Sequence, residues 1–395
     1  MIEITDKKMC SGCHACYSVC PQNCIDMIKD DEGFLYPLVD KDRCIKCGAC
    51  IRACHILNPY EMDNNPTAYA AYLSDENIRQ NSSSGGLFTP LSEYILSLGG
   101  VVFGAVFDDK FNVNHSCIEK KEDLEKLRGS KYVQSIIGET HKQAEEFLKQ
   151  GRKVLFSGTP CQTAGLKFYL KKEYENLYLI DIICHGVPSP KIWEEYLKLT
   201  EDKNNDKVKK ISFRDKTKGW RKFSMVFDFK TKKRQLKTLD DDRYMYGFLR
   251  NIYLRPSCYA CVEKSLHRKT DLTIADYWGI ENVHSEFSDD KGISLVFVNS
   301  EKGDKLFSKI NDSVIKIDTD IKKAASYNTA ATSSAKPNDN RDAFFNELNV
   351  IPFNKLMDKY CQDDFSIRVI GKFELIVRKL ESGVKLLIRK LSYRA

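Results

Sequence analysis

Two cysteine-rich segments near the amino terminus share one spacing, CxxCxxCxxxC, and this repeat constrains the fold more than any other feature. The first opens the stretch CSGCHACYSVCP at residues 10–21, and the second occupies residues 44–54. Each short CxxCxxC loop can bind three corners of a 4Fe-4S cube, whereas the fourth cysteine lies one turn further on and binds the other cluster. The predicted ligand sets are therefore crossed: one cluster takes Cys10, Cys13, Cys16 and Cys54, and the other takes Cys44, Cys47, Cys50 and Cys20.

Other uses of these thiols fit the pattern less well. A zinc ion takes four tetrahedral ligands, so eight cysteines at a doubled triplet spacing disfavour a zinc site. The chain has 15 cysteines in 395 residues, and its opening, MIEITDKKMC, has acids and lysines where a secretion signal has an apolar stretch. No apolar run reaches the roughly 18 residues that a membrane span requires. We therefore expect a cytoplasmic protein whose thiols bind metal or carry out redox chemistry.

Residues 1–58 resemble the bacterial-type ferredoxins that carry two 4Fe-4S clusters. The resemblance implies that this domain transfers single electrons, so the remaining residues must determine where those electrons go. His55 stands where a second proline is expected, which leaves the local turn unpredicted. Cys24 lies outside the pattern and is interpreted as a buried small apolar residue.

The rest of the chain predicts an α/β domain with a mixed sheet. Apolar strands at 101–107, 153–159, 177–184 and 293–299 alternate with helical patterns at 140–151, 161–174 and 190–200. The polar residues 59–66, with a proline at each end, indicate a linker. The predicted fold is α+β or α/β, with a ferredoxin-like domain at 1–58, a larger mixed-sheet domain at 67–327, a linker and accessory segment at 328–364, and a basic amphipathic helix at 365–395.

Two predicted helix starts could bind phosphate. Ser83, Ser84, Gly85 and Gly86 precede one amphipathic helix, and Ser157, Gly158 and Thr159 lie between a strand and another helix. Free backbone N–H groups, hydroxyls and the positive end of a helix dipole favour an anion there. Ordinary helix capping explains the same residues equally well. The strand-GxGxxG-helix fingerprint of a dinucleotide-binding Rossmann fold is absent from the sequence.

A third group of cysteines lies outside the repeat. Cys161 opens a helix, Cys184 ends a strand, and Cys258 and Cys261 form a CxxC. Cysteines at the carboxyl ends of two strands can converge on one edge of a sheet, where the CxxC would complete a four-thiolate site for a third 4Fe-4S cluster. A redox-active CxxC, a zinc site that uses His185, or inert buried thiols are the alternatives.

Electron chemistry predicts one further cofactor. Clusters pass one electron at a time, whereas most metabolic donors and acceptors exchange hydride, so a protein that joins the two usually contains a flavin.

Residues 60–310 resemble the family of coenzyme F420 hydrogenase and dehydrogenase beta subunits. The matching stretches, in order, are SSSGGLFT, GSKYVQS, LFSGTPCQTAGLK, DIICHGVPSP, ISFRDKTKGW, RPSCYAC and RKTDLTIADYWGI. The resemblance implies FAD, an iron–sulfur cluster, and hydride exchange with a deazaflavin such as coenzyme F420 or with another small substrate. It also places Ser83, Ser84, Gly85 and Gly86 at the FAD phosphates, Lys131, Tyr132 and Gln134 near the flavin, and Cys161, Cys184, Cys258 and Cys261 at the cluster.

Two residues are candidates for catalysis. His185, beside Cys184, could donate a proton, or it could hydrogen-bond a cluster sulfur. Lys131 could act beside the flavin, or it could be an ordinary surface charge. Geometry is needed to separate these alternatives.

The positive charge of the chain is concentrated at its carboxyl end. Of a formal net charge of +7, most comes from residues 366–395, where eight lysines and arginines face two glutamates. Apolar residues at steps of three and four predict an amphipathic helix that docks on the core, joins a second copy, or lies on the inner face of an anionic membrane. No interleaved basic and aromatic patch suggests nucleic acid.

The sequence therefore predicts an iron–sulfur flavoprotein oxidoreductase. It would exchange electrons with a ferredoxin-like or other redox protein and hydride with a small molecule. The alternative is a non-catalytic electron-transfer subunit that serves a partner enzyme, in a setting such as polysaccharide biosynthesis, which the resemblance includes among its relatives.

Overall fold

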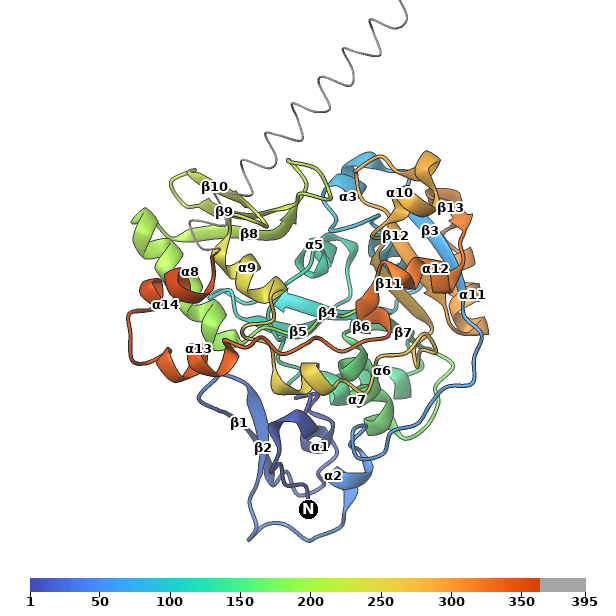
Figure 1. Ribbon diagram of the computed structural model, residues 1–395. Helices are drawn as coiled ribbons and strands as arrows, with labels where there is room; N and C mark the ends of the chain where they lie inside the picture. The colour runs from blue at the N-terminus through green and yellow to red at the C-terminus, as the bar shows by residue number, and fades with distance from the viewer. Residues whose placement is uncertain (363–395) are drawn as a thin grey trace, which may run out of the picture.

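The computed structural model describes residues 1–362 (Figure 1). The basic amphipathic helix predicted at 365–395, and with it the proposed core, oligomer and membrane contacts, lies outside the described residues. Among residues 1–362, no helix combines the length and the apolar composition needed to cross a membrane.

The first 58 residues form a small domain whose two halves match each other. Strands β1 (Ile25–Lys29) and β2 (Leu35–Val39) pair antiparallel. Each cysteine loop leads into a four-residue helix, α1 (Ala15–Ser18) or α2 (Ala49–Arg52). The residue before each helix, His14 or Gly48, has a left-handed backbone with φ of 61° or 72°. The repeat in the sequence is thus a repeat in the backbone.

The larger domain is built on an eight-stranded mixed sheet, as predicted. Its strand order is β13-β3-β12-β11-β7-β6-β4-β5. The central strands β11, β7, β6 and β4 run parallel, and the outer pairings are antiparallel. The strand bounds are β3 (Thr67–Leu73), β4 (Val101–Phe107), β5 (Val113–Ile118), β6 (Val154–Gly158), β7 (Leu177–Ile182), β11 (Leu272–Asp276), β12 (Ser294–Val298) and β13 (Val314–Asp318).

Helices cover both faces of this sheet because its central strands are apolar on both sides. Val102 and Leu155 pack toward α4 (Phe88–Ser97), α5 (Leu124–Leu127) and α11 (Glu301–Ser308). Phe103 and Phe156, one residue further along, pack toward α6 (Thr140–Lys149) and α7 (Pro160–Leu170). Side chains alternate along a strand, so a run of apolar residues requires two covering layers.

A second, antiparallel sheet joins the helices of a separate core. It contains β8 (Val208–Asp215), β9 (Ser224–Phe229) and β10 (Arg234–Thr238), and it packs with α8 (Pro190–Asn204) and α9 (Arg243–Leu249). The segment 328–364, expected to be a linker and accessory region, contributes α13 (Arg341–Glu347) and α14 (Phe353–Tyr360) to this core through Phe344 and Met357. The remaining α-helices are α3 (Glu76–Gln80), α10 (Ile280–Val283) and α12 (Ile321–Ser326).

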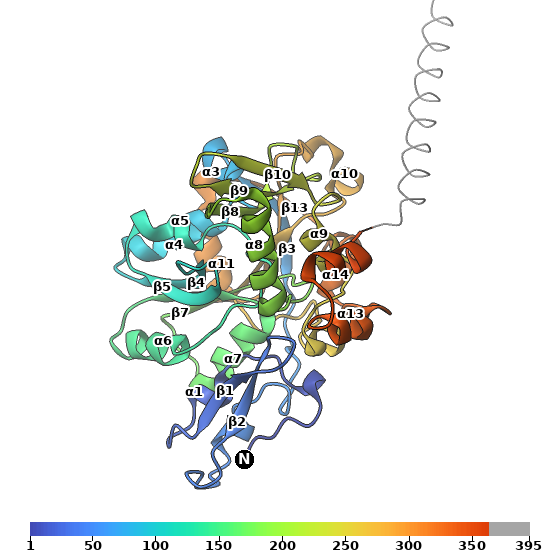
Figure 2. The same ribbon diagram turned by 90° about the vertical axis from the view of Figure 1, so that its left-hand side faces the viewer.

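The ferredoxin-like domain forms one end of the molecule and sits against α7 and α6, as Figures 1 and 2 both show. Arg255 fastens it to the body. This buried guanidinium donates to the backbone oxygen of Cys10 at 2.8 Å, to that of Leu35 at 2.8 Å and to the side chain of Gln134 at 2.9 Å. Gln134 in turn donates to the oxygen of Ser11 at 2.9 Å.

Candidate functional site

The eight repeat cysteines line two separate cavities. One is lined by Cys10, Cys13, Cys16 and Cys54, and the other by Cys20, Cys44, Cys47 and Cys50. The last cysteine of each segment therefore lies at the cavity of the other segment, as crossed ligation requires. Cys24, interpreted from the sequence as a packing residue, is buried and also lines the second cavity, with its Sγ 3.4 Å from that of Cys20.

The donor chemistry of these cavities fits 4Fe-4S clusters. Ile2, Ile4 and Ile56 give the first cavity an apolar wall around its thiols. Burial, followed by repulsion from the neighbouring Cys13, Cys10 and Cys54, raises the pKa of Cys16 well above its usual value. A bound cationic iron centre would offset the cost of deprotonating these buried thiols, because thiolates are stabilised by the metal they ligate. Among the described residues, no group of three or more histidine, cysteine, aspartate or glutamate side chains is arranged to hold a single metal ion.

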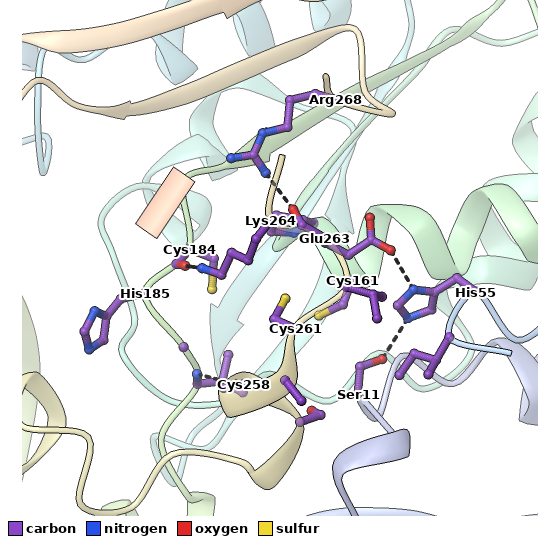
Figure 3. A pocket seen from close by; sticks show the side chains of 17 residues that line it. Ser11, His55, Cys161, Cys184, His185, Cys258, Cys261, Glu263, Lys264 and Arg268 are labelled. Atoms are coloured by element: carbon purple, nitrogen blue, oxygen red, sulfur yellow. Dashed lines mark hydrogen bonds and ion pairs between the residues drawn. The ribbon is translucent and has the colours of Figure 1, made fainter. Parts of the chain in front are cut away.

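The third group of cysteines also meets at one cavity (Figure 3). Strands β6 and β7 are parallel neighbours, so Cys161 at the start of α7 and Cys184 just after β7 emerge at the same edge of the sheet. The 3-10 helix η3 (Pro256–Ala260) brings Cys258 and Cys261 to the same place. Four thiols from three parts of the chain thus surround a space of about 590 Å³, open mouth included.

Electrostatics at this third cavity also favour a cationic centre. Burial, and secondly the nearby Cys184, raises the pKa of Cys258 to about 12. Burial, and secondly Cys261, raises the pKa of Cys161 well above its usual value. Donors already face the sulfurs: the backbone N–H of Val187 donates to the Sγ of Cys258 at 3.4 Å. This cavity thus presents four thiols and a hydrogen-bond donor of the kind that tunes the potential of a cluster.

His55 joins the third cavity to the first. Its Nε2 lies 2.9 Å from Ser11 Oγ, and its Nδ1 lies 2.8 Å from Glu263 Oε1, whose carboxylate also accepts from Lys269 Nζ at 3.0 Å. The imidazole is only 1% exposed. Burial alone would lower the pKa of His55, but its contacts with Cys13 and Glu263 outweigh burial and raise it to about 9. Ser11, His55 and Ile56 line both cavities, so the two sites share a wall.

Gly165 of α7 lies at this contact between the two domains. A Cβ added there would lie 2.8 Å from the Cβ of Cys13 and 3.1 Å from its Sγ. Gly165→Ala is therefore expected to displace Cys13 and to destabilise the protein by about 1–3 kcal/mol, as overpacking does. Anaerobic thermal unfolding, together with iron content, would measure the effect. Lys149→Ala, at the exposed end of the neighbouring helix α6, should be close to neutral because it removes only a surface ion pair. Equal effects for the two variants would contradict this account.

The loop Ser83–Gly86 precedes α4 and is held firmly by the body of the protein. Ser83 Oγ accepts from the backbone N–H of Ser130 at 2.8 Å, and Ser84 Oγ donates to the oxygen of Ile293 at 2.9 Å. A Cβ on Gly85 would lie 2.5 Å from the oxygen of Ala71, and Gly86 has a φ of +89°. Close packing therefore explains the glycine at position 85, and the left-handed backbone explains the glycine at position 86.

Cations that the sequence interpretation did not single out surround this loop. Lys216 is buried and donates to the backbone oxygens of Arg79 at 2.7 Å, Ser84 at 2.8 Å and Lys291 at 2.6 Å. Arg214, also buried, forms a two-pronged ion pair with Asp276 at 2.8 and 3.0 Å. The stretch ISFRDKTKGW contains both cations, but only the folded chain shows that they lie beside the serine loop.

Lys131 and Tyr132 lie next to the same loop. Burial lowers the pKa of Lys131 to about 7, and its Nζ is within 3.2–3.5 Å of three backbone oxygens at the end of α5. Tyr132 Oη accepts from Arg214 at 3.0 Å, and its ring stacks on Phe248 with centroids 4.7 Å apart. The ring of Phe248 packs edge-to-face against the ring of His185, with centroids 5.2 Å apart. Aromatic contacts therefore link the loop region to the third cavity.

Four of the predicted cofactor residues have structural roles in the fold. Thr159 caps α7 in a reciprocal capping box with Gln162, and Ser157 Oγ donates to the oxygen of Phe103 at 2.9 Å. Gly158, between them, ends β6, so this helix start follows the capping alternative. Gln134, expected near the flavin, uses its amide at the ferredoxin-like domain as described above.

His185 lines the third cavity, but its ring points away from the four cysteines (Figure 3). Its Nε2 lies 2.6 Å from Asn251 Oδ1. Two cations also line this cavity: Lys264, which donates to the backbone oxygen of Cys184, and Arg268, which donates to the backbone oxygen of Glu263 at 3.3 Å. Neither cation was a predicted site residue, because a lone lysine or arginine carries no distinguishing sequence pattern.

Comparison with known proteins places this architecture in a family. Residues 68–139 match the N-terminal part of the coenzyme F420 hydrogenase/dehydrogenase beta subunit, and residues 151–323 match its C-terminal part. The chain belongs to the family of coenzyme F420 hydrogenase/dehydrogenase beta subunits. Residues 9–56 match a 4Fe-4S dicluster domain, so this family member carries an iron–sulfur domain at its amino terminus.

Two curated relatives are similar to this family member. The coenzyme F420-dependent sulfite reductase of Methanocaldococcus jannaschii is 26% identical over 77% of this chain and 46% of its own length. One subunit of the F420H2 dehydrogenase of Methanosarcina mazei is 24% identical over 50% of this chain and 60% of its own length. The chain thus spans about half the length of these relatives.

Among solved structures, a chain of the F420-reducing [NiFe] hydrogenase complex from Methanosarcina barkeri is similar to this family member. It is 20% identical, the match covers 76% of this chain and 91% of that one, and the TM-score is 0.45.

Proposed function

We propose that this protein is an iron–sulfur flavoprotein oxidoreductase that moves electrons between a ferredoxin-like redox protein and a small hydride-exchanging substrate, with an F420-type deazaflavin as the first candidate. The observation that carries the proposal is the wall of Ser11, His55 and Ile56 that the first and third cysteine cavities share. Two adjacent thiol-lined sites suit electron hopping from the small domain into the body. When bound, clusters supply one-electron transfer and FAD converts single electrons to hydride.

The residues of the chain would hold and tune the clusters in this scheme. The crossed sets at the first two cavities would hold two clusters, and Cys161, Cys184, Cys258 and Cys261 would hold a third. His55, which is held by Ser11 and Glu263, would keep the two adjoining cavities in a fixed relative position across the domain boundary. Lys264 and Arg268 supply positive charge at the edge of the third cavity, which favours the reduced, more negative state of a cluster.

The serine loop is our candidate for the flavin. Lys131 offers a cation for the diphosphate beside the Ser83–Gly86 loop, whose Gly85 N–H already donates to Ser294 Oγ at 3.1 Å, and Lys216 lies behind the loop. Tyr132 and Phe248 would provide aromatic surface between that site and the third cavity. Ser157, Gly158 and Thr159 would act through the capping of α7, which positions Cys161.

The lowered pKa of Lys131 predicts pH-dependent FAD binding. The amine is charged below about pH 7 and neutral above it, whereas the diphosphate keeps its charge from pH 6 to pH 8. FAD affinity should therefore fall about tenfold over that range if binding restores an ordinary lysine pKa. Lys131→Met should weaken this dependence without abolishing it, because burial also lowers the pKa of the neighbouring Lys216 to about 7. Lys153→Met, just before β6, should keep it in full. Fluorescence titration of the deflavinated protein with FAD would measure both, and a pH-independent wild type would contradict the assignment.

The same lysine affects stability in the opposite direction. Its folded-state pKa lies below the usual 10.5, so the unfolded chain binds the extra proton between those two values. The unfavourable contribution of Lys131 is therefore complete below about pH 7 and disappears as the pH rises toward 10.5.

Anaerobic purification followed by cofactor analysis tests the proposed function. We expect about twelve irons and one FAD per chain, as three 4Fe-4S clusters and one flavin require. Reduced ferredoxin should then reduce F420, or F420H2 should reduce ferredoxin, in the presence of the isolated protein. A preparation with eight irons and no flavin would contradict the proposal.

A non-catalytic electron-transfer subunit is the second candidate. It is favoured by the length comparison, since the chain spans only about half of its curated relatives, one of which is itself described as a subunit. Such a subunit would bind its clusters and accept electrons but show no steady-state turnover with small acceptors until a partner enzyme is added.

A further inference from the structure

More than half of the large apolar side chains that are exposed in the described chain lie in or beside the ferredoxin-like domain. Among residues 1–362, fifteen large apolar side chains are exposed, and eight belong to the first 60 residues. They are Met1, Met9, Ile28, Leu38, Ile45, Ile51, Leu57 and Tyr60. These 60 residues are about one-sixth of the described chain, so exposed apolar side chains are concentrated in and beside the ferredoxin-like domain.

The second cysteine cavity lies at this surface. Cys47 is the exposed member of its ligand set, whereas Cys20 and Cys44 are half-buried and Cys50 is buried. Ile45, between two of the cysteines, is 61% exposed and also lines the cavity. A cluster held here would be close to solvent, at the end of the molecule remote from the large sheet (Figures 1 and 2).

Charge in the domain is divided between its two halves. Residues 41–54 contain four exposed cations, Lys41, Arg43, Lys46 and Arg52, and one carboxylate, Asp42. Residues 1–40 have the opposite balance, with three lysines and seven acidic residues. One of these acids, Glu32, faces the body, where it pairs with Arg341 at 3.0 Å. The positive half therefore coincides with the exposed cysteine.

We propose that Lys41, Arg43, Ile45, Lys46, Cys47 and Ile51 form a docking surface for a small acidic redox protein. This inference rests on the proposed function and specifies the partner of its electron-transfer domain. The cluster that Cys20, Cys44, Cys47 and Cys50 would hold would accept one electron from the partner's redox centre, with no proton transferred and no bond formed or broken. Lysines and arginines steer an acidic partner, while exposed isoleucines desolvate the contact around the cluster.

Charge reversal tests the docking surface in the full holoprotein. Stopped-flow absorbance would follow cluster reduction by a reduced, acidic bacterial ferredoxin in wild type, Lys41→Glu/Lys46→Glu and Lys41→Gln/Lys46→Gln. We expect the second-order rate constant to fall about tenfold or more for the reversal and less for the neutral pair at low salt. The difference should shrink at 1 M salt, where the Debye length is about 3 Å.

The matched control reverses two exposed lysines elsewhere, Lys309→Glu/Lys322→Glu, on the large domain. Iron content, and the extent of cluster reduction reached with excess dithionite, should be equal in all variants. Equal slowing by both double reversals, or no slowing by Lys41→Glu/Lys46→Glu, would overturn the proposal. The proposal would also be overturned if Lys41→Glu/Lys46→Glu alone lost the self-association of the wild type or its binding to phosphatidylserine vesicles. The surface would then contact a second copy or a membrane. Cluster reduction is read without F420, so normal docking with no F420 turnover would count against the proposed function alone.

Discussion

Cys258→Ala is expected to remove one of the three proposed clusters and to disconnect the small domain from the proposed flavin. Cys258 is one of four thiols around the third cavity, and no spare cysteine lines that cavity to replace it. Iron should fall from about twelve to about eight per chain. Because the first two cavities lie outside the change, dithionite should still reduce their clusters. Reduction of the flavin by ferredoxin should be lost.

The control for this experiment is Cys117→Ala. Cys117 lies on β5, packs against the core on the α6 and α7 side, and lines none of the three cysteine cavities. Iron content and flavin reduction should remain at the wild-type level. Parallel iron and sulfide assays with electron paramagnetic resonance would measure both variants. Full iron in Cys258→Ala would show that the third cavity does not hold a cluster.

Arg255→Met should have the largest effect on stability. The fully buried guanidinium holds three oxygens, and it also approaches the Sγ of Cys10 at 3.5 Å. Methionine fills much of the volume but leaves these buried acceptors without a donor. We expect a loss of about 3 kcal/mol or more, in the range for breaking a buried charged contact. Losing an N–H···S contact should also make the potential of the first cluster more negative.

Arg234→Met provides the matched control, because Arg234 pairs with Asp215 at the surface of the second sheet and is half exposed. Its removal should cost less than about 1 kcal/mol and leave every cluster potential unchanged. Anaerobic denaturation and a redox titration followed by electron paramagnetic resonance would measure the two variants. A similar small cost for both arginines would refute the role of Arg255 as the fastening between the domains.

The pattern of apolar residues was sufficient to predict much of the fold. The strands predicted at 101–107, 153–159, 177–184 and 293–299 correspond to β4, β6, β7 and β12, and the helices at 140–151, 161–174 and 190–200 correspond to α6, α7 and α8. These elements were predictable because their burial on one or two faces imposes a period of two or about 3.6 on the local sequence. The second antiparallel sheet and the packing of α13 and α14 were not predicted, since their strands are mixed in polarity and their contacts are distant in sequence.

Side-chain partners show the same division within the candidate site. Gln134 falls in a stretch that resembles a flavin-binding motif, yet its amide contacts Ser11 and Arg255. His55 replaces a proline in the repeat, and its partner Glu263 is 208 residues away. No local pattern can specify a hydrogen bond between residues so far apart, because the geometry arises only when α7 and the cysteine loops pack.

Cysteine spacing alone determined which thiols could share a cluster in the small domain, because loops of two intervening residues limit which corners of a cube one segment can reach. The positions of Cys161, Cys184, Cys258 and Cys261 after predicted strands and in a CxxC also predicted that a third set of thiols converges at one edge of the large sheet. Tertiary structure alone decided that this set meets the first cavity at a shared wall. That meeting depends on two parallel strands ending side by side and on a helix that approaches Cys13 closely at Gly165. Such long-range packing leaves no period in the sequence from which it could be read.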